Sequence, residues 1–481
     1  MENNSVLCAR GITDTADSYI EGRLEIPSGM PDISCLLCAS ATAKTAGTLC
    51  SSGSVTVKGS VLYQILYVTA EGEPMSFDAR CDFEFSAAGA YTEDMSAAAV
   101  TSVTDTAYSA SARSVDIKSK LCSYIFAGTN REIVYPDTEG AQVKAQTAKL
   151  FKISDIKAAE ARTQGRITIG QNMPEVKKVL FTSSAAFITD IHRDTGRIAL
   201  EGELRLNIVY LGTDKNAPLQ YMNETVPFSQ FIAVSGQGEP ELYAVPSGLY
   251  VEKDEVSPDV LNYDCSIDIA IKSGEYCEAN LALDAYCVKN EYELKYDNAC
   301  VEEISSGRPQ KRMVRTLLSI PENLPEASRV LTSSASAEVS DAVCKNGSIS
   351  LKGSFYVTVC YTTVEDGMKS AKLEAPFETE VSADVSPEYT AKPAIFCEYA
   401  VAEGSGRDIE LRVCTVIYPY AEKCASVKTV CGITLGEETP KNSGMTLVLG
   451  TSQDPWEVMK AYRTAPEGVI DLDGGRYLVI T

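Results

Sequence analysis

The stretch TGRIALEGELRLNIVYL, residues 195–211, decides the fold of this chain. Over a dozen positions, apolar residues and one glycine alternate with mostly polar ones, a period of two that is typical of a long β-strand with one buried face. The residues that share this predicted face are Ile198, Leu200, Gly202, Leu204, Leu206, Ile208 and Tyr210. The strand is entered through Gly196, where a hairpin turn favours the positive φ that glycine adopts.

The same pattern occurs twice more, as SGSVTVKGSVLYQILYV at 52–68 and NGSISLKGSFYVTVCYT at 346–362. Five positions keep their spacing without a gap in all three copies: a proline, the acid after it, two glycines and a tyrosine. These repeat-defining residues are Pro31, Asp32, Gly53, Gly59 and Tyr67; Pro174, Glu175, Gly196, Gly202 and Tyr210; and Pro325, Glu326, Gly347, Gly353 and Tyr361. Their separation of roughly 150 residues makes each repeat domain-sized, unlike the short units of a solenoid.

The fixed residues also carry local predictions. The second glycine of each copy lies on the buried face in mid-strand, which predicts a bulge or a close approach of another backbone. The proline and its acid predict one helical turn, and Val176–Phe181 is the best helical candidate among the repeats. Turn formation explains the proline–acid pairs, and a partner-binding role is the alternative.

Further period-two runs follow in each copy, and few amphipathic helices occur before residue 437. The predicted strands include Phe83–Phe85, Ile117–Phe126, Asp264–Ile271, Asn280–Cys287, Ile409–Tyr418 and Ser426–Ile433. The fold class is therefore mainly all-β: three tandem β-sandwich-like domains and a small tail. We expect the repeats at 1–150, 151–305 and 306–437 and the tail at 438–481, with linkers near Lys152–Gln164 and Ser305–Arg315.

The tail has a different pattern. Met445–Gly450 reads as a short strand, and Asp454-Pro455 supplies an N-cap followed by proline at the first helical position. Trp456, Val458, Met459 and Tyr462 have helical apolar spacing. A second short helix over Pro466–Leu472 and a strand over Arg476–Ile480 complete a β-α-α-β order.

Composition excludes several classes of function. The chain has 66 acidic and 43 basic residues, a net charge of −23, which disfavours binding to nucleic acid or anionic membranes. Its one histidine, His192, excludes most histidine catalysis and most zinc sites. The N-terminus lacks a signal-peptide pattern and no segment has 18 consecutive apolar residues, so we expect an intracellular protein whose 16 cysteines are reduced and mostly buried.

Several features that resemble sites have simpler interpretations. Glu302-Glu303 and Glu437-Glu438 lie in linker-like stretches, where solvated charge is the expectation. His192 precedes a predicted hairpin turn, and Gly404–Asp408 lacks the lysine of a phosphate-binding loop. The only CxxC, Cys35–Cys38, has no second pair at metal-site spacing. We therefore assign no catalytic residue, cofactor or metal.

The three copies resemble the SPOCS domain, and the tail resembles a LysM module, with Trp456, Tyr462 and Leu478–Ile480 at the matching positions. Three SPOCS-like repeats followed by LysM are similar to spore-coat morphogenesis proteins. The resemblance implies a non-enzymatic protein of the mother-cell cytoplasm, located at the forespore surface and coat. Its tail would bind a SpoIVA-like coat morphogenetic ATPase.

The tail departs from the LysM pattern in both loops that bind glycan in that family. Ser452-Gln453-Asp454 replaces a Gly-Asp pair, and Asp473-Gly474-Gly475 is shortened. The resemblance then implies protein recruitment, with Trp456, Met459, Tyr462 and Asp473 as partner-binding candidates, although Trp456 and Tyr462 also suit the core of so small a module. Binding of peptidoglycan or another N-acetylglucosamine polymer through the tail is the alternative function.

Overall fold

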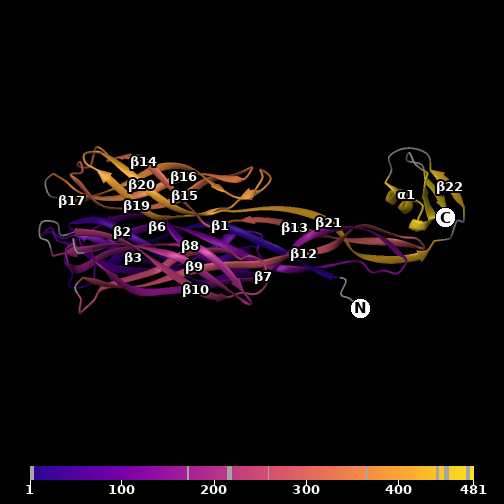
Figure 1. Ribbon diagram of the computed structural model, residues 1–481, viewed down its shortest axis with the longest axis horizontal. Coiled ribbons are helices and arrows are strands. Elements are labelled where there is room, and N and C mark those ends of the chain that lie inside the picture. Colours follow the sequence, from indigo (N-terminus) through magenta and orange to yellow (C-terminus); the bar gives the residue numbers. More distant parts are fainter. Residues whose placement is uncertain are drawn as a thin grey trace.

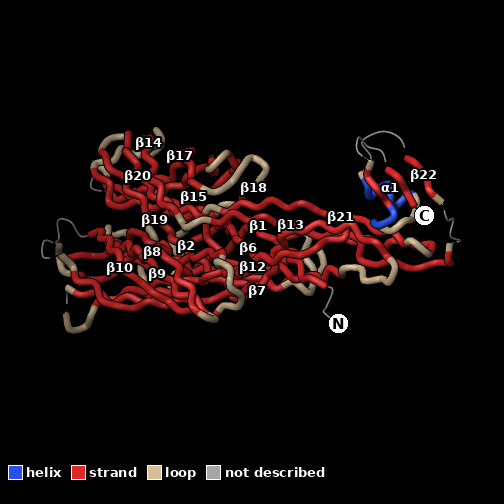
Figure 2. The backbone as a smooth tube through the Cα atoms, turned by 45° about the vertical axis from the view of Figure 1, so that its right-hand side comes forward, coloured by secondary structure: helices blue, strands red, loops and turns tan. Residues whose placement is uncertain are grey.

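The computed structural model describes residues 5–170, 173–213, 219–257, 259–364, 367–439, 444–448, 454–472 and 477–480. Strands dominate these residues, so the all-β prediction is confirmed (Figure 1). Figure 2 shows strand along nearly the whole tube, with helix confined to the tail. No helix in these ranges is long and apolar enough to cross a lipid bilayer.

Each repeat contributes two three-stranded antiparallel sheets. In the first repeat the sheet order is β1-β6-β5 and β2-β3-β4, and apolar residues of both sheets form one core. The strands are β1 (Ser5–Glu25), β2 (Cys35–Ser51), β3 (Ser54–Val68), β4 (Pro74–Ala88), β5 (Ser96–Ala110) and β6 (Ser114–Val134). This is the two-layer arrangement that alternating patterns favour.

The second and third repeats keep this plan. Their sheet orders are β11-β12-β7 with β10-β9-β8, and β14-β20-β19 with β15-β16-β17. The strands of the second are β7 (Ala141–Thr168), β8 (Val176–Asp194), β9 (Arg197–Gly212), β10 (Leu219–Ala233), β11 (Glu241–Lys253) and β12 (Val260–Cys287). Those of the third are β14 (Gln310–Ser319), β15 (Arg329–Lys345), β16 (Ser348–Thr362), β17 (Met368–Ser382), β19 (Ala394–Gly404) and β20 (Asp408–Tyr418).

The repeat-defining proline and tyrosine meet in all three copies. The Tyr210 hydroxyl donates to the Pro174 carbonyl at 3.1 Å, and the equivalent bonds of Tyr67 to Pro31 and of Tyr361 to Pro325 are both 3.0 Å. The predicted helical turn after the proline is wrong, because β8 begins at Val176 and pairs with β9 from its first residue. The segment is instead held in extended form against the end of the central strand.

The second glycine of each repeat lies beneath an aromatic ring and against a neighbouring backbone. A Cβ built on Gly202 would lie 2.6 Å from the Phe228 ring and 2.7 Å from the Phe187 carbonyl oxygen. Phe83 and Phe377 cover Gly59 and Gly353 in the same way. The strand facing each glycine has a register shift there, as between Ile188 and Asp190. Only a residue without a side chain leaves room for this approach.

The repeats share a core in addition to their own. Phe126 of β6 stacks on Tyr243 of β11 with ring centroids 4.7 Å apart, and Tyr243 meets Tyr418 of β20 at 5.9 Å. Each pair of repeats is also joined by an ion pair. These pairs are Lys44–Glu160 at 2.9 Å, Lys120–Glu338 at 2.7 Å and Lys311–Glu203 at 3.1 Å. The three repeats therefore pack as one body (Figure 1).

Long strands continue beyond the body as a stalk, which we define as 141–153, 274–287, 290–306 and 420–438. It consists of the outer parts of β7 and β12 with β13 (Asn290–Ser306) and β21 (Tyr420–Glu438), packed through small apolar clusters. The short β18 (Thr390–Ala391) extends the β13-β21 sheet. Figure 1 shows these strands running out towards the tail.

The predicted linkers are wrong, because both lie largely within paired strands. Residues 152–164 belong to β7 and pair with β12, and Ile153, Ile156 and Ala161 are buried there. Residues 310–315 belong to β14. Strands β7 and β13 run without a break across positions 150 and 305, and the domain bounds themselves stay a prediction.

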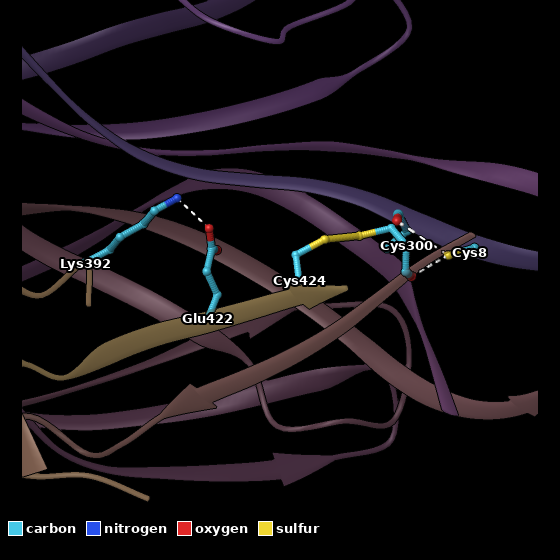
Figure 3. Close-up of a disulfide and its surroundings, with 6 residues drawn as sticks. Cys8, Cys300, Lys392, Glu422 and Cys424 are labelled. Carbon is cyan, nitrogen blue, oxygen red and sulfur yellow. Dashed lines mark hydrogen bonds and ion pairs between the residues drawn. A yellow bond between two sulfur atoms is a disulfide. The ribbon is translucent and has the colours of Figure 1, made fainter. Parts of the chain in front are cut away.

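One cysteine pair is bonded. Cys300 of β13 and Cys424 of β21 form a disulfide, with Cα atoms 6.4 Å apart at diagonal positions of the paired strands (Figure 3). The Cys8 thiol donates to the Cys300 carbonyl at 2.9 Å. The expectation that every thiol is reduced is wrong for this pair, whereas the other fourteen cysteines, all within the described ranges, are free and mostly buried.

The tail has one short sheet and one α-helix. Its elements are β22 (Met445–Val448), α1 (Pro455–Ala461), the 3₁₀ helix η1 (Pro466–Gly468), β23 (Val469–Asp471) and β24 (Tyr477–Ile480). Asp454 caps α1 by accepting the Trp456 amide, as predicted. The prediction of a second helix over Pro466–Leu472 is wrong. Only one 3₁₀ turn forms before β-branched Val469 and Ile470 pair with β24.

We predict that Gly202→Ala lowers the free energy of unfolding by about 1–3 kcal/mol, because its methyl group would overlap the Phe187 carbonyl, which belongs to a paired strand. The measurement is the chemical denaturation midpoint. Gly248→Ala is the control, since nothing lies within 4 Å of a Cβ built there. Equal destabilisation by both variants would show that close packing is not why Gly202 is a glycine.

Candidate functional site

The tail rests on the stalk through Trp456, the only tryptophan of the chain. Its indole Nε1 donates to the Asp284 carboxylate of β12 at 2.8 Å, and its ring lies edge-on to Tyr286, with centroids 5.1 Å apart. Tyr286 is fully buried, and its hydroxyl donates to the Thr464 carbonyl at 2.6 Å. The tryptophan therefore serves an intramolecular contact.

We call this contact between the tail and the stalk the dock. Ion pairs surround it. Lys460, one turn after Trp456, binds both Asp284 carboxylate oxygens at 2.7 and 2.8 Å. Arg463 forms a bidentate pair with Glu291 of β13, both bonds at 2.8 Å. Burial alone would raise the pKa of Asp284, but the hydrogen bonds from Lys460 and Trp456 outweigh it and the pKa is lowered. The dock thus favours an ionised Asp284.

The structure places the predicted partner-binding residues in different surroundings. Trp456 contacts the stalk and is half-buried. Met459 is also half-buried. Tyr462 is 39% exposed, and no stalk contact involves its side chain among the described interactions. Asp473 lies outside the described residues. The partner-binding role of all four stays a prediction.

A buried ionic cluster, which the sequence did not reveal, joins the three repeats where the stalk leaves the body. Lys272 of β12 is fully buried, with its ammonium 3.3 Å from Glu241 and 3.2 Å from the Tyr420 hydroxyl. Thr13 of the first repeat donates to the same hydroxyl at 2.9 Å. Tyr420 in turn donates to Glu422, which pairs with Lys392 (Figure 3). Each repeat supplies at least one member.

Glu302 belongs to this cluster, so the expectation that it is a solvated charge is wrong. Its side chain is in β13 and the residue is 3% exposed, whereas its neighbour Glu303 points to solvent. Burial raises the pKa of Glu302, and the charge of Lys272 offsets this only in part. Burial likewise raises the pKa of Glu241. Burial would lower the pKa of Lys272, but the carboxylates around it prevail and raise it.

Other features that the sequence suggested as sites lie outside this cluster, in the described ranges. These ranges contain no cluster of three or more histidine, cysteine or acidic side chains that could hold a metal ion. His192 is at the exposed end of β8, 3.1 Å from Asp190. The last acids of β21, Glu437 and Glu438, are exposed.

The three repeats border an open cavity of about 440 Å³ at their junction, whose wall also includes the charged side chains Lys372, Glu374 and Glu398. Three equivalent strand segments, 39–43, 183–186 and 333–337, line it with alanine, serine and threonine alone. In the gap-free alignment of the repeats these segments overlap, at 8–12, 9–12 and 8–12 residues after the proline. Small side chains here allow three sheets to approach one another, so we interpret the cavity as a packing feature.

The repeat geometry described above agrees with a family assignment for one segment. Residues 175–267 match the family described as SipL, SPOCS domain. The matched SPOCS segment begins at the acid after Pro174 and contains β8 to β11 and the first part of β12. It supports a sporulation-related protein. No curated protein and no solved structure matches the chain.

We predict that Asp284→Ala loosens the contact of the tail with the stalk. The substitution removes the acceptor of both Trp456 and Lys460. The fluorescence emission of Trp456 should therefore shift to longer wavelength, and acrylamide should quench it more strongly. Asp297→Ala is the matched control, because Asp297 pairs with Arg131 on the same stalk and its side chain is equally exposed. Unchanged emission in the Asp284 variant would contradict the dock.

We predict that Glu302→Gln reduces the loss of stability at rising pH. With its pKa raised on folding, Glu302 contributes stability that falls as the pH increases from about 4.5 through the raised pKa. Denaturation between pH 5 and 9 should show the variant gaining stability relative to the native chain. Glu303→Gln, the exposed neighbour, should stay parallel to the native chain. Parallel curves for Glu302→Gln would contradict its burial as an acid.

Proposed function

We propose that the chain is a non-enzymatic scaffold and adaptor of spore-coat assembly. The observation that carries this is the SPOCS match at 175–267, set in a chain whose repeat-defining residues recur three times. Proteins that combine such repeats with a LysM-like tail act in coat morphogenesis, which is the resemblance that the sequence analysis described. Under this proposal the protein works in the mother-cell cytoplasm at the forespore surface.

The tail is the proposed recruitment module, and the proposed partner is a SpoIVA-like coat morphogenetic ATPase. Supporting this is its position at the end of the stalk, away from the repeat body (Figure 1). A binding module placed there can reach a partner without interference from the repeats. The repeats would then supply further surfaces for other coat proteins.

Binding of peptidoglycan is the rival proposal, and one observation disfavours it. Trp456, the side chain best suited to stack on a sugar ring, has its indole nitrogen bonded to Asp284 and its ring against Tyr286. The same engagement leaves protein recruitment open, because other parts of the tail remain exposed.

The test is direct binding of the purified full chain to the purified coat ATPase, beside a 1–437 truncation. We expect the full chain to bind and the truncation to bind at least about tenfold more weakly, a loss of about 1.4 kcal/mol or more. Circular dichroism of the truncation controls for folding of the repeats. Equal binding by both chains would move the contact to the repeats.

A pelleting assay with purified cortex peptidoglycan separates the two proposals. We expect the full chain to stay in the supernatant. Co-sedimentation that disappears in the 1–437 truncation would favour the glycan-binding alternative and contradict the recruitment proposal.

A further inference from the structure

Each repeat has a loop around its repeat-defining proline, which we call the proline loop: 26–32, 169–175 and 320–326. In the first repeat the Arg113 guanidinium holds this loop. It donates to the carbonyls of Pro27 and Met30 at 3.3 and 2.6 Å, and it pairs with Asp32 at 3.0 Å. A guanidinium has five N–H donors in one plane, so a single side chain can bind several carbonyls and a carboxylate at once.

The third repeat has the same arrangement. Arg407 donates to the carbonyls of Pro321 and Leu324 at 3.1 and 3.2 Å. It also pairs with Glu326 at 3.2 Å. In both repeats the carbonyl five positions before the proline accepts a longer bond from the arginine, at 3.4 and 3.5 Å. Two repeats therefore bind a guanidinium with the same set of acceptors.

The second repeat has an acid in place of this arginine. Asp259 directly precedes the central strand β12, as the two arginines precede β6 and β20. The Asp259 carbonyl accepts from the Ile169 amide at 2.8 Å, and the equivalent bonds to the arginine carbonyls are 3.0 and 2.9 Å. The loop also keeps its turn, because the Met173 amide donates to the Gly170 carbonyl at 2.9 Å. The backbone is thus equivalent, and the charge at the decisive position is reversed.

No other basic side chain replaces the arginine within the described residues. No side chain in these ranges donates to the carbonyl of Gly170 or Met173. Within the same part of the chain, Glu175 and Asp259 have no ion-pair partner, and both are exposed. Arg166, which is close in sequence, is bonded at 3.0 Å to a carboxylate of the loop before β12. The acceptors of the second proline loop are therefore available to a donor from outside the chain.

This loop lies at the end of the body opposite the stalk. Strand β7 begins in the stalk and ends at Thr168, directly before the loop. Strand β12 begins at Val260, directly after Asp259, and runs back into the stalk. Figure 1 shows the stalk and the tail at one end of the molecule, with the body extending to the other. A molecule bound at this loop would not compete with the docked tail.

The acceptors fit an arginine side chain that is carried on a polypeptide. Arg113 and Arg407 show this loop binding a guanidinium from a protein chain, and two carboxylates without a partner favour a cation. A lysine ammonium is compact and would reach fewer of the acceptors. Free arginine would bring its own carboxylate beside two acids. A second copy of the chain is disfavoured by its net charge of −23.

We propose that the proline loop of the second repeat is a binding site for an arginine side chain of another protein. Its acceptors are the carbonyls of Gly170 and Met173 and the carboxylates of Glu175 and Asp259. The other two repeats fill the equivalent site with an arginine of their own. The inference goes beyond the proposed function, because it assigns a partner contact to the repeats whatever the tail binds.

The first test is a titration of the full chain with N-acetyl-arginine amide, followed by NMR of the Gly170, Met173 and Glu175 backbone amides. We expect saturable shifts with this compound, smaller shifts with N-acetyl-lysine amide and none with the neutral N-acetyl-citrulline amide. The shifts should be lost in Asp259→Arg, because the introduced arginine fills the site as Arg113 does in the first repeat. No response to the arginine compound, or an equal response to citrulline, would overturn the inference.

Chemical denaturation tests the acceptor set without a ligand. We expect Asp259→Arg to unfold at a higher denaturant concentration than Asp259→Ala, since only the arginine can bind the carbonyls and Glu175 together. Arg113→Ala in the first repeat is the reverse control and should lower the midpoint of the native chain. A midpoint for Asp259→Arg no higher than that of Asp259→Ala would contradict a site built for a guanidinium.

The last test places a photo-cross-linking amino acid at exposed position 177 of the full chain in sporulating cells. Position 34 is the matched control, because it is exposed and lies at the same offset from the proline in the first repeat, whose loop is filled by Arg113. We expect a cross-link specific to position 177, to an arginine-containing segment of another protein, and its loss in Asp259→Arg. A cross-link that persists in Asp259→Arg, one to a second copy, or none beyond the control would overturn the inference.

Discussion

The charge of Lys272 is the constraint on which the arrangement of this molecule depends. A fully buried ammonium requires carboxylates and hydroxyls around it, and removing one partner of such a group is costly, about 3–5 kcal/mol. Its partners come from separate parts of the chain: Glu241 of β11 in the second repeat, Glu302 of β13 and Tyr420 of β21. The first repeat is joined through Thr13. Placing this one side chain therefore places the three repeats.

The position of Lys272 along β12 also determines the direction of the stalk. Before Lys272, β12 is the central strand of a sheet in the second repeat; after it, the strand pairs with β7 alone and leaves the body. Asp284 and Tyr286, near its end, hold the tail. One strand thus connects the shared core, the ionic cluster and the dock, so the position of the tail depends on packing in the body.

Local regularity explains which features the sequence predicted. The period of two in 195–211 and the fixed offsets of Gly196 and Gly202 follow from contacts within one repeat, and the strands and turns appear where they were expected. The N-cap at Asp454 was visible for the same reason. The helical turn after Pro174 failed because the carbonyl of that proline is bonded to Tyr210, 36 residues away.

Features that depend on contact between repeats could not be predicted in this way. Glu302 resembles a solvated acid until Lys272 is placed beside it, and Lys152–Gln164 resembles a linker until β12 covers it. The pairing of Cys300 with Cys424 requires the register of β13 and β21. Asp284 carries no sequence signal, because its partners Trp456 and Lys460 are more than 170 residues away.

We propose that the tail stays docked on the stalk when it binds its partner. Because Trp456 is the only tryptophan, incorporation of 5-fluorotryptophan gives a single ¹⁹F resonance that reports on the dock. Titration with the unlabelled coat ATPase should broaden this resonance without moving it towards the position observed in Asp284→Ala. A shift to that position on binding would show that the partner displaces the dock, and would contradict the account.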